Sequence, residues 1–130
     1  MSIARPRILL AEDEFLVALS TTDLLEGAGC EIVGPVSQVA PGRGLALSET
    51  LDAAVLDINL AGEMVWPIAE ALTDRGVPFV FLSAYVPQSV IPEKFAAVPR
   101  LDKPVDGKRL LRELEAMWEH AGAARRASMG

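Results

Sequence analysis

The sequence lacks the features of several classes of protein. It has one cysteine, Cys30, so neither a disulfide nor a thiolate metal cluster can form within the chain. No apolar run approaches the roughly 20 residues that span a bilayer, and the N-terminus has no apolar signal segment. Basic residues are few, because 12 Lys and Arg stand against 18 Asp and Glu, a net charge of −6. Such a surface repels nucleic-acid phosphates and anionic lipids, so we expect a cytoplasmic protein with neither DNA nor membrane partners.

What is present is enough for one folded domain. The chain has 130 residues, of which 51% are hydrophobic and 23% charged. This length fits a single core, and this composition is that of a globular chain. We expect a domain over residues 7–120, with an N-terminal tail at 1–6 and a frayed C-terminal tail at 121–130.

Short apolar runs alternate with segments of helical periodicity. Four of these runs have the continuous apolar character of strands buried on both faces: residues 8–11, 32–33, 53–56 and 79–82. A weaker fifth run at 98–101 contains Pro99, which suits an edge strand. Strands alternating with helices predict an α/β, doubly wound parallel sheet.

Three of the expected helices are regular, the first, the third (residues 65–74) and the last, and two contain helix-breaking residues. In the first, residues 14–28, the stripe predicted to be buried consists of Val17, Leu24 and Ala28, with Thr21 in its gap. The last helix, starting after Asp106, has apolar residues every three or four positions. The second helix, within 37–49, contains Pro41, Gly42 and Gly44, and the fourth, within 86–97, contains Pro87 and Pro92. Both are therefore predicted to be irregular.

Acidic residues stand directly after two of the strands. Glu12 and Asp13 follow the first strand, and Asp57 follows the third. If the strand order is 2-1-3-4-5, these strands are neighbours and the three carboxylates converge where ligands bind in open α/β sheets. Clustered carboxylates repel one another unless one is protonated or a cation lies among them. An all-oxygen ligand set favours Mg²⁺.

Each of these residues has an ordinary structural interpretation when taken alone. An acidic pair after a strand commonly interacts with a helix N-terminus, and a lone serine such as Ser83 commonly bonds to nearby backbone. A lysine such as Lys103 is most often a solvated charge. Together, however, they supply a metal site, a nucleophile, a hydroxyl and a cation at one edge of the sheet, which is a set for phosphoryl transfer.

In this order and spacing, four motifs resemble the receiver domain of two-component response regulators: ILLAEDE (8–14), LDIN (56–59), FLSA (81–84) and KP (103–104). The resemblance implies a flavodoxin-like (βα)5 fold with strand order 2-1-3-4-5. It implies that Asp57 accepts a phosphoryl group from a histidine kinase or a histidine phosphotransfer protein. It also implies a role for each site residue. Asp13, Asp57 and the Asn59 carbonyl would bind Mg²⁺ directly, and Glu12 would bind it through water. Ser83 and Lys103 would contact the phosphoryl oxygens, and the peptide bond before Pro104 would be cis.

By the same resemblance the chain is a signalling switch and not a metabolic enzyme, catalysing its own phosphotransfer and slow dephosphorylation. Arg100 departs from the family pattern, because common receivers have an aromatic switch residue three positions before the lysine. Instead, Tyr85 follows Ser83 by two residues, and FLSAY (81–85) is similar to the Phe-Ala-Thr-Gly-Tyr-type signature of single-domain alphaproteobacterial receivers. The implied output is a change in residues 85–100 that alters contacts with a downstream protein that the sequence does not identify.

Two aromatic residues near the site allow further hypotheses. The Tyr85 ring either excludes hydrolytic water from a phosphorylated Asp57 or packs on a nearby proline. Phe15 and Leu19 lie off the expected buried stripe and form a candidate patch for docking the phosphohistidine-bearing partner.

Three alternatives have to be weighed against a phosphorylated receiver. A phosphorylation-independent interaction module with the same fold stays open because of Arg100. A flavin-binding protein is disfavoured, since Glu12, Asp13 and Glu14 would repel the flavin phosphate. An aspartyl phosphohydrolase is also disfavoured, because it needs a second acid two residues after the first-strand nucleophile, where this chain has Phe15.

Overall fold

The chain folds around a five-stranded parallel sheet. The computed structural model describes residues 5–84 and 86–129, with side chains through residue 119. The order of strands in the sheet is β2-β1-β3-β6-β7. Their bounds are Arg7–Ala11 for β1, Glu31–Val36 for β2, Ala53–Asp57 for β3, Phe79–Ser83 for β6 and Arg100–Asp102 for β7. Counting only these five strands, this is the predicted order 2-1-3-4-5, and the flavodoxin-like fold is confirmed.

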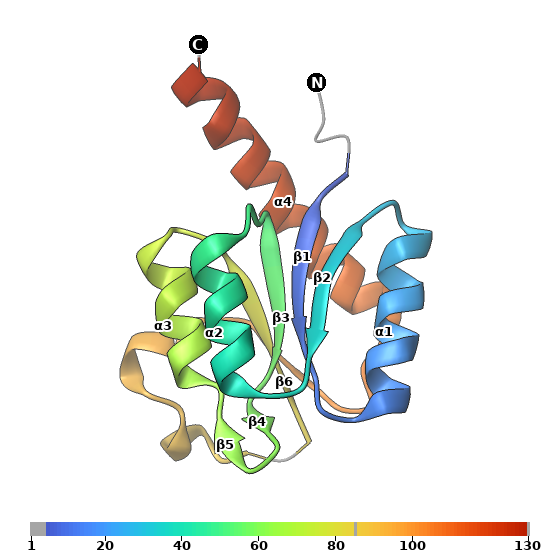
Figure 1. The fold of residues 1–130 in the computed structure, drawn as a ribbon, viewed down its shortest axis with the longest axis vertical. Coiled ribbons are helices and arrows are strands. Elements are labelled where there is room, and N and C mark those ends of the chain that lie inside the picture. Colours follow the sequence, from blue (N-terminus) through green and yellow to red (C-terminus); the bar gives the residue numbers. More distant parts are fainter. Residues whose placement is uncertain (1–4, 85, 130) are drawn as a thin grey trace.

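Helices cover both faces of the sheet (Figure 1). Their bounds are Phe15–Gly27 for α1, Val39–Ser48 for α2, Trp66–Asp74 for α3 and Gly107–Met129 for α4. Side chains of α2 and α3 share one core cluster with Leu9, Leu56 and Phe81. Side chains of α1 and α4 share the other cluster with Ile8 and Val55. Because alternate residues of each central strand enter opposite clusters, the strands are apolar throughout.

The second helix is regular, contrary to the prediction of an irregular one. Pro41 is the third residue of α2, within the first turn, where a helix has backbone N–H groups without partners inside the helix. Gly42 lies against α3, and a Cβ atom placed there would come within 2.4 Å of Ile68 Cδ1. Two residues that are unfavourable in an isolated helix are therefore accommodated by the position of the first and the packing of the second.

Residues 86–97, where the sequence places the fourth of its five expected helices, form no regular helix, as Pro87 and Pro92 predict. The segment contains two short 3₁₀ turns instead, η1 (Gln88–Val90) and η2 (Glu93–Phe95), which directly follow Pro87 and Pro92. Phe95 anchors this segment to the sheet, because its ring lies 5.9 Å from that of Trp66 and 6.0 Å from that of Phe81. Trp66 of α3 therefore packs against Phe81 of β6 and Phe95 of η2.

The first helix buries a different stripe from the predicted one. Its buried residues are Ala18, Thr21 and Leu25, with Thr21 alone common to both sets. Residues 15–19 are all apolar, so hydrophobic periodicity does not mark the inner face there. Phe15 and Leu19 are exposed as expected, and so is Leu16.

The ends of the domain also differ from expectation. The edge strand β7 begins two residues later than the predicted run at 98–101 and ends one residue later. The last helix continues through residues 121–129, which were expected to form a frayed tail, and it projects beyond the sheet (Figure 1). Alanine and arginine in this stretch are good helix formers. Within the part of the chain that the structure describes, no helix is long and apolar enough to cross a membrane.

Candidate functional site

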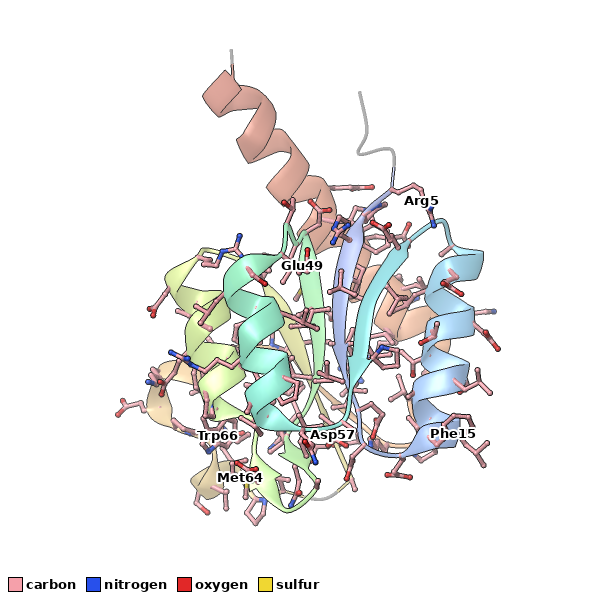
Figure 2. The ribbon with its side chains drawn as sticks, in the orientation of Figure 1. Arg5, Phe15, Glu49, Asp57, Met64 and Trp66 are labelled. Carbon is pink, nitrogen blue, oxygen red and sulfur yellow. The ribbon has the colours of Figure 1, made fainter. Side chains whose placement is uncertain are left out.

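The predicted acidic residues meet at the carboxyl ends of neighbouring strands. Ala11 of β1 pairs with Leu56 of β3, so the residues after β1 are level with Asp57, the last residue of β3. The chain leaves these two adjacent strands toward helices on opposite faces, α1 and α3. This is the topological switch point at which open α/β sheets bind ligands. Phe15 and Asp57 lie toward the same end of the molecule, far from Arg5 and Glu49 (Figure 2).

Three carboxylates form a compact group there. Glu12, Asp13 and Asp57 each contribute one oxygen, and these oxygens all lie within 4.8 Å of one another. Glu12 and Asp57 are buried, whereas Asp13 is exposed. Buried like charges at this spacing repel strongly unless a cation offsets them. The donor set is entirely oxygen, which matches the preference of Mg²⁺.

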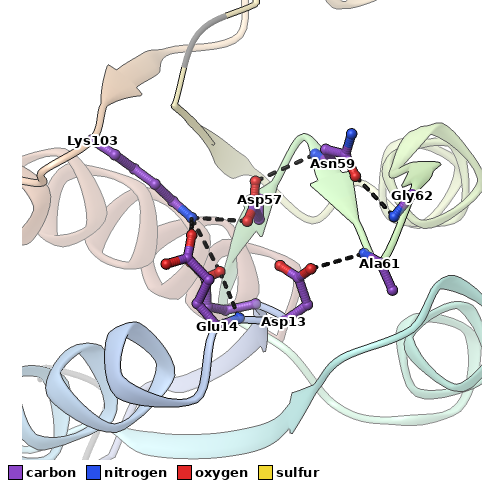
Figure 3. Close-up of polar contacts among 8 residues, drawn as sticks. Asp13, Glu14, Asp57, Asn59, Ala61, Gly62 and Lys103 are labelled. Carbon is purple, nitrogen blue, oxygen red and sulfur yellow. Dashed lines mark hydrogen bonds and ion pairs between the residues drawn. The ribbon is translucent and has the colours of Figure 1, made fainter.

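Lys103 provides the positive charge of this group (Figure 3). Its Nζ lies 2.9 Å from Asp57 Oδ2, 2.9 Å from Glu12 Oε1 and 3.3 Å from Glu14 Oε1. The Lys103 backbone N–H donates to the Ser83 carbonyl at 2.8 Å, which holds the lysine beside the end of β6. The peptide bond from Lys103 to Pro104 is cis, as the resemblance implied.

The pKa values of Glu12 and Lys103 are both raised. Burial raises the pKa of Glu12 to about 7; the hydrogen bond from Lys103 opposes this shift and the negative charge of Asp57 adds to it. Burial lowers the pKa of Lys103, but hydrogen bonds and charge attraction from Asp57 and Glu12 outweigh that effect and raise it. Lys103 therefore stays cationic, and Glu12 takes up a proton near neutral pH when no metal ion offsets its charge.

A small hairpin that sequence reasoning missed positions two site residues. The hairpin pairs β4 (Asn59–Leu60) with β5 (Glu63–Met64). Its turn residues, Ala61 and Gly62, both have positive φ, 50° and 87°. The Ala61 N–H donates to Asp13 Oδ2 at 3.0 Å, and the Gly62 N–H donates to Asn59 Oδ1 at 3.0 Å. The two-residue turn with glycine between short extended runs was the available signal.

The site opens as a pocket of about 300 Å³. Its lining residues are Asp13, Glu14, Asp57, Asn59, Ala84, Val86 and Lys103. Ser83 is buried at the end of β6, beside this lining and not part of it. Glu14, with 61% of its side chain exposed, was not predicted as a site residue, although it completes the acidic run 12–14.

The remaining predicted residues lie around this pocket. Asn59 donates its backbone N–H to Asp57 Oδ1 at 3.3 Å. Arg100 is half-buried in β7 and donates from Nη1 to the Val86 carbonyl at 2.9 Å. Phe15 is 76% exposed at the start of α1. Tyr85 lies outside the described residues, so its predicted role stays a prediction.

Comparison with known proteins identifies the family. No family model matches the chain, and no curated protein matches it. Among solved structures, SdrG from Sphingomonas melonis Fr1 is 36% identical with a TM-score of 0.76, covering 88% of this chain and 98% of that one. SdrG has also been solved in a BeF3-activated conformation, at a TM-score of 0.70, 36% identity and coverage of 86% and 95%.

Two more distant structures share the fold. A response regulator receiver domain protein (CheY-like) from Methanospirillum hungatei JF-1 has a TM-score of 0.79 at 23% identity, covering 89% and 95% of the chains. The receiver domain of sensor histidine kinase PA1611 from Pseudomonas aeruginosa PAO1 has a TM-score of 0.76 at 21% identity, covering 88% and 98%, and holds a magnesium ion in its active-site cleft. With the acidic pocket, the fold and the identity to SdrG taken together, this chain belongs to the receiver domains of response regulators.

Proposed function

We propose that the chain is a phosphorylation-dependent switch in which Asp57 accepts a phosphoryl group from a histidine kinase or a histidine phosphotransfer protein. The observation that carries this proposal is the position of the Asp57 carboxylate. It lies at the switch point, lines the open pocket and is 2.9 Å from the Lys103 ammonium. A carboxylate held in this way is accessible for attack and has a cation beside the place where negative charge arrives.

The chemistry is an in-line displacement at phosphorus. An Asp57 oxygen attacks the phosphorus, the bond between phosphorus and the imidazole nitrogen breaks, and its electron pair stays on the imidazole. The Lys103 ammonium exchanges part of its contact with Asp57 for a phosphoryl oxygen. The Ser83 hydroxyl donates to another phosphoryl oxygen. Both contacts offset the negative charge of the phosphoryl oxygens, which is greater on phosphorylated Asp57 than on the free carboxylate.

The residues also fit a divalent cation. Asp13, Asp57 and the Asn59 carbonyl would hold Mg²⁺ directly, with Glu12 acting through water. When bound, the ion neutralises charge on the carboxylates and on the incoming phosphoryl oxygens. The Ala61 N–H holds one Asp13 oxygen and leaves the other available as a ligand.

The partner surfaces lie next to the pocket. The exposed patch formed by Phe15, Leu16 and Leu19 starts two residues after Asp13, so a helical bundle carrying a phosphohistidine would contact the patch and the pocket together. Output would pass through residues 85–100 to a downstream protein in the cytoplasm, and the similarity of FLSAY (81–85) to the Phe-Ala-Thr-Gly-Tyr-type signature would place the chain among single-domain receivers. Tyr85 would restrict the access of hydrolytic water and lengthen the phosphorylated lifetime.

Phosphoryl uptake by the purified protein tests this proposal. Incubation with acetyl phosphate and Mg²⁺ should add the mass of one phosphoryl group, and the same incubation with EDTA should add none, as measured by intact-protein mass spectrometry. Absence of uptake from both acetyl phosphate and a phosphorylated histidine phosphotransfer protein would favour the second candidate, a phosphorylation-independent interaction module. The arginine at position 100, in place of the aromatic switch residue, is the feature that favours that candidate.

Lys103→Met should separate phosphoryl transfer from metal binding. The change removes the ammonium and keeps most of the apolar stem, so the rate of uptake from acetyl phosphate should fall about 100-fold, as for loss of one strong charge-stabilising donor. Mg²⁺ should bind more tightly, because the carboxylates of Glu12, Glu14 and Asp57 lose the ammonium group that they contact. Rates at saturating Mg²⁺ and Mg²⁺ titrations measure the two effects. A variant with an unchanged rate would contradict the proposed role of Lys103.

A further inference from the structure

The Arg100 side chain joins the edge strand to the wall of the pocket. Arg100 is paired with Phe81 in the β6–β7 ladder, and its Nη1 donates to the Val86 carbonyl at 2.9 Å. Val86 lines the same pocket as Asp57. A guanidinium is charged at every working pH, and a charge-assisted hydrogen bond is stronger than a neutral one. Arg100 therefore holds one side of the pocket from outside it.

Two contacts hold residues 86–90 to the sheet, the hydrogen bond from Arg100 and the packing of the Val86 side chain against the core. The other hydrogen bonds involving residues 86–90, among the described residues, are local ones within and next to η1, such as Val90 N–H to the Pro87 carbonyl. Beyond them, Ile91 and Phe95 are buried in the core and hold the far end of the segment. Few long-range contacts are typical of a segment that can move as a unit.

In the sheet, Arg100 and Asp57 belong to strands on opposite sides of β6, the strand that precedes this segment. In the order β3-β6-β7, Asp57 ends β3 on one side of β6, and Arg100 belongs to β7 on the other side. If a group bound to Asp57 draws Val86 away from Arg100, a movement of about 1 Å is enough to lengthen the 2.9 Å hydrogen bond beyond useful range.

We propose that Arg100 is a positioning residue that holds Val86 in the unphosphorylated arrangement and opposes phosphoryl binding at Asp57. The inference rests on the proposed function and adds its regulation. A contact that exists only in the unphosphorylated arrangement stabilises that arrangement. A ligand that binds better to the phosphorylated arrangement then has to overcome the free energy of the contact, and its affinity falls by that amount. Removing the guanidinium should accordingly favour the phosphorylated arrangement.

Beryllofluoride, a stable mimic of the phosphoryl group, tests the inference in the presence of Mg²⁺. Arg100→Met keeps the apolar stem without donors and should bind beryllofluoride about fivefold more tightly than the unmodified protein. Arg100→Lys keeps a charged donor and should restore the affinity toward that of the unmodified protein. Without beryllofluoride, amide hydrogen exchange of residues 86–90 should be faster in Arg100→Met, and in the unmodified protein it should rise when beryllofluoride binds.

The outcomes separate the inference from the proposed function. If the unmodified protein binds beryllofluoride and Arg100→Met binds it equally or more weakly, the opposing role of Arg100 is wrong while the proposed function stands. If the unmodified protein neither binds beryllofluoride nor takes up phosphoryl groups, both fail. Should Arg100→Met not fold, as judged by thermal unfolding, Arg100→Gln removes the charge and shortens the side chain, and the same tighter binding is expected of it.

Discussion

Asp57→Asn should abolish phosphoryl uptake. Asparagine has nearly the same shape as aspartate, but its neutral amide is a poor nucleophile and cannot form the acyl phosphate. The Asn59 N–H can still donate to the side-chain oxygen at position 57, so the local backbone should stay in place. Incubation with acetyl phosphate and Mg²⁺, followed by intact mass measurement, should show no added phosphoryl group on this variant.

Asp52→Asn is the matched control for this loss. Asp52 and Asp57 are both buried aspartates, and they flank the same strand at its two ends, Asp52 just before β3 and Asp57 as its last residue. Asp52 accepts the Arg7 backbone N–H at 2.8 Å, which an asparagine oxygen can also do. Asp52→Asn should take up the phosphoryl group normally. Equal uptake by the Asp57→Asn variant would mean that the acceptor is elsewhere.

Phe81→Ala should lower the free energy of unfolding by about 4 kcal/mol. Phe81 is fully buried in β6, and its ring packs edge-on against Trp66 at 5.6 Å and Phe79 at 5.4 Å. The substitution leaves a cavity that rigid strand and helix backbones cannot close, and it removes aromatic contacts worth about 0.5–1.5 kcal/mol each beyond their burial. Urea denaturation followed by circular dichroism measures the change.

Phe15→Ala provides the comparison, because it removes the same atoms from an exposed position. Phe15 is at the start of α1 with most of its surface in solvent, so its loss should change the free energy of unfolding by less than about 0.5 kcal/mol. Similar effects of the two substitutions would show that the aromatic cluster around Phe81 does not stabilise the core. A large effect of Phe15→Ala alone would show that the patch on α1 packs against the domain.

Much of the site was predictable from the sequence because parallel strands end at one edge of the sheet. Once the buried runs were recognised, Glu12, Asp13 and Asp57 had to emerge at that edge, and Lys103 had to follow the last strand. The same reasoning did not find Glu14 as a partner of Lys103, since an exposed acidic residue at a helix start has many other uses. Nor did it find the β4–β5 hairpin, whose two-residue strands are too short for an apolar alternation to be visible.

Local propensity and tertiary packing disagree most clearly in the helices. Pro41 and Gly42 predict a broken second helix, yet α2 is regular because Gly42 allows close contact with Ile68 of α3. In α1, five consecutive apolar residues contain no information on which face is inside, and packing on the sheet decides it. Conversely, Pro87 and Pro92 each stand directly before a short 3₁₀ turn, and no regular helix runs through residues 86–97, because proline has no backbone N–H to donate within a helix.

The sequence by itself determined the alternation of strands and helices and the convergence of the acidic residues, because these follow from hydrophobic patterning and from the direction of parallel strands. Only the tertiary structure decided which atoms meet: Lys103 among three carboxylates, Asp13 on the hairpin backbone and Arg100 on the Val86 carbonyl. These contacts join residues far apart in the chain, and their distances depend on the packing of whole elements, which no local pattern encodes.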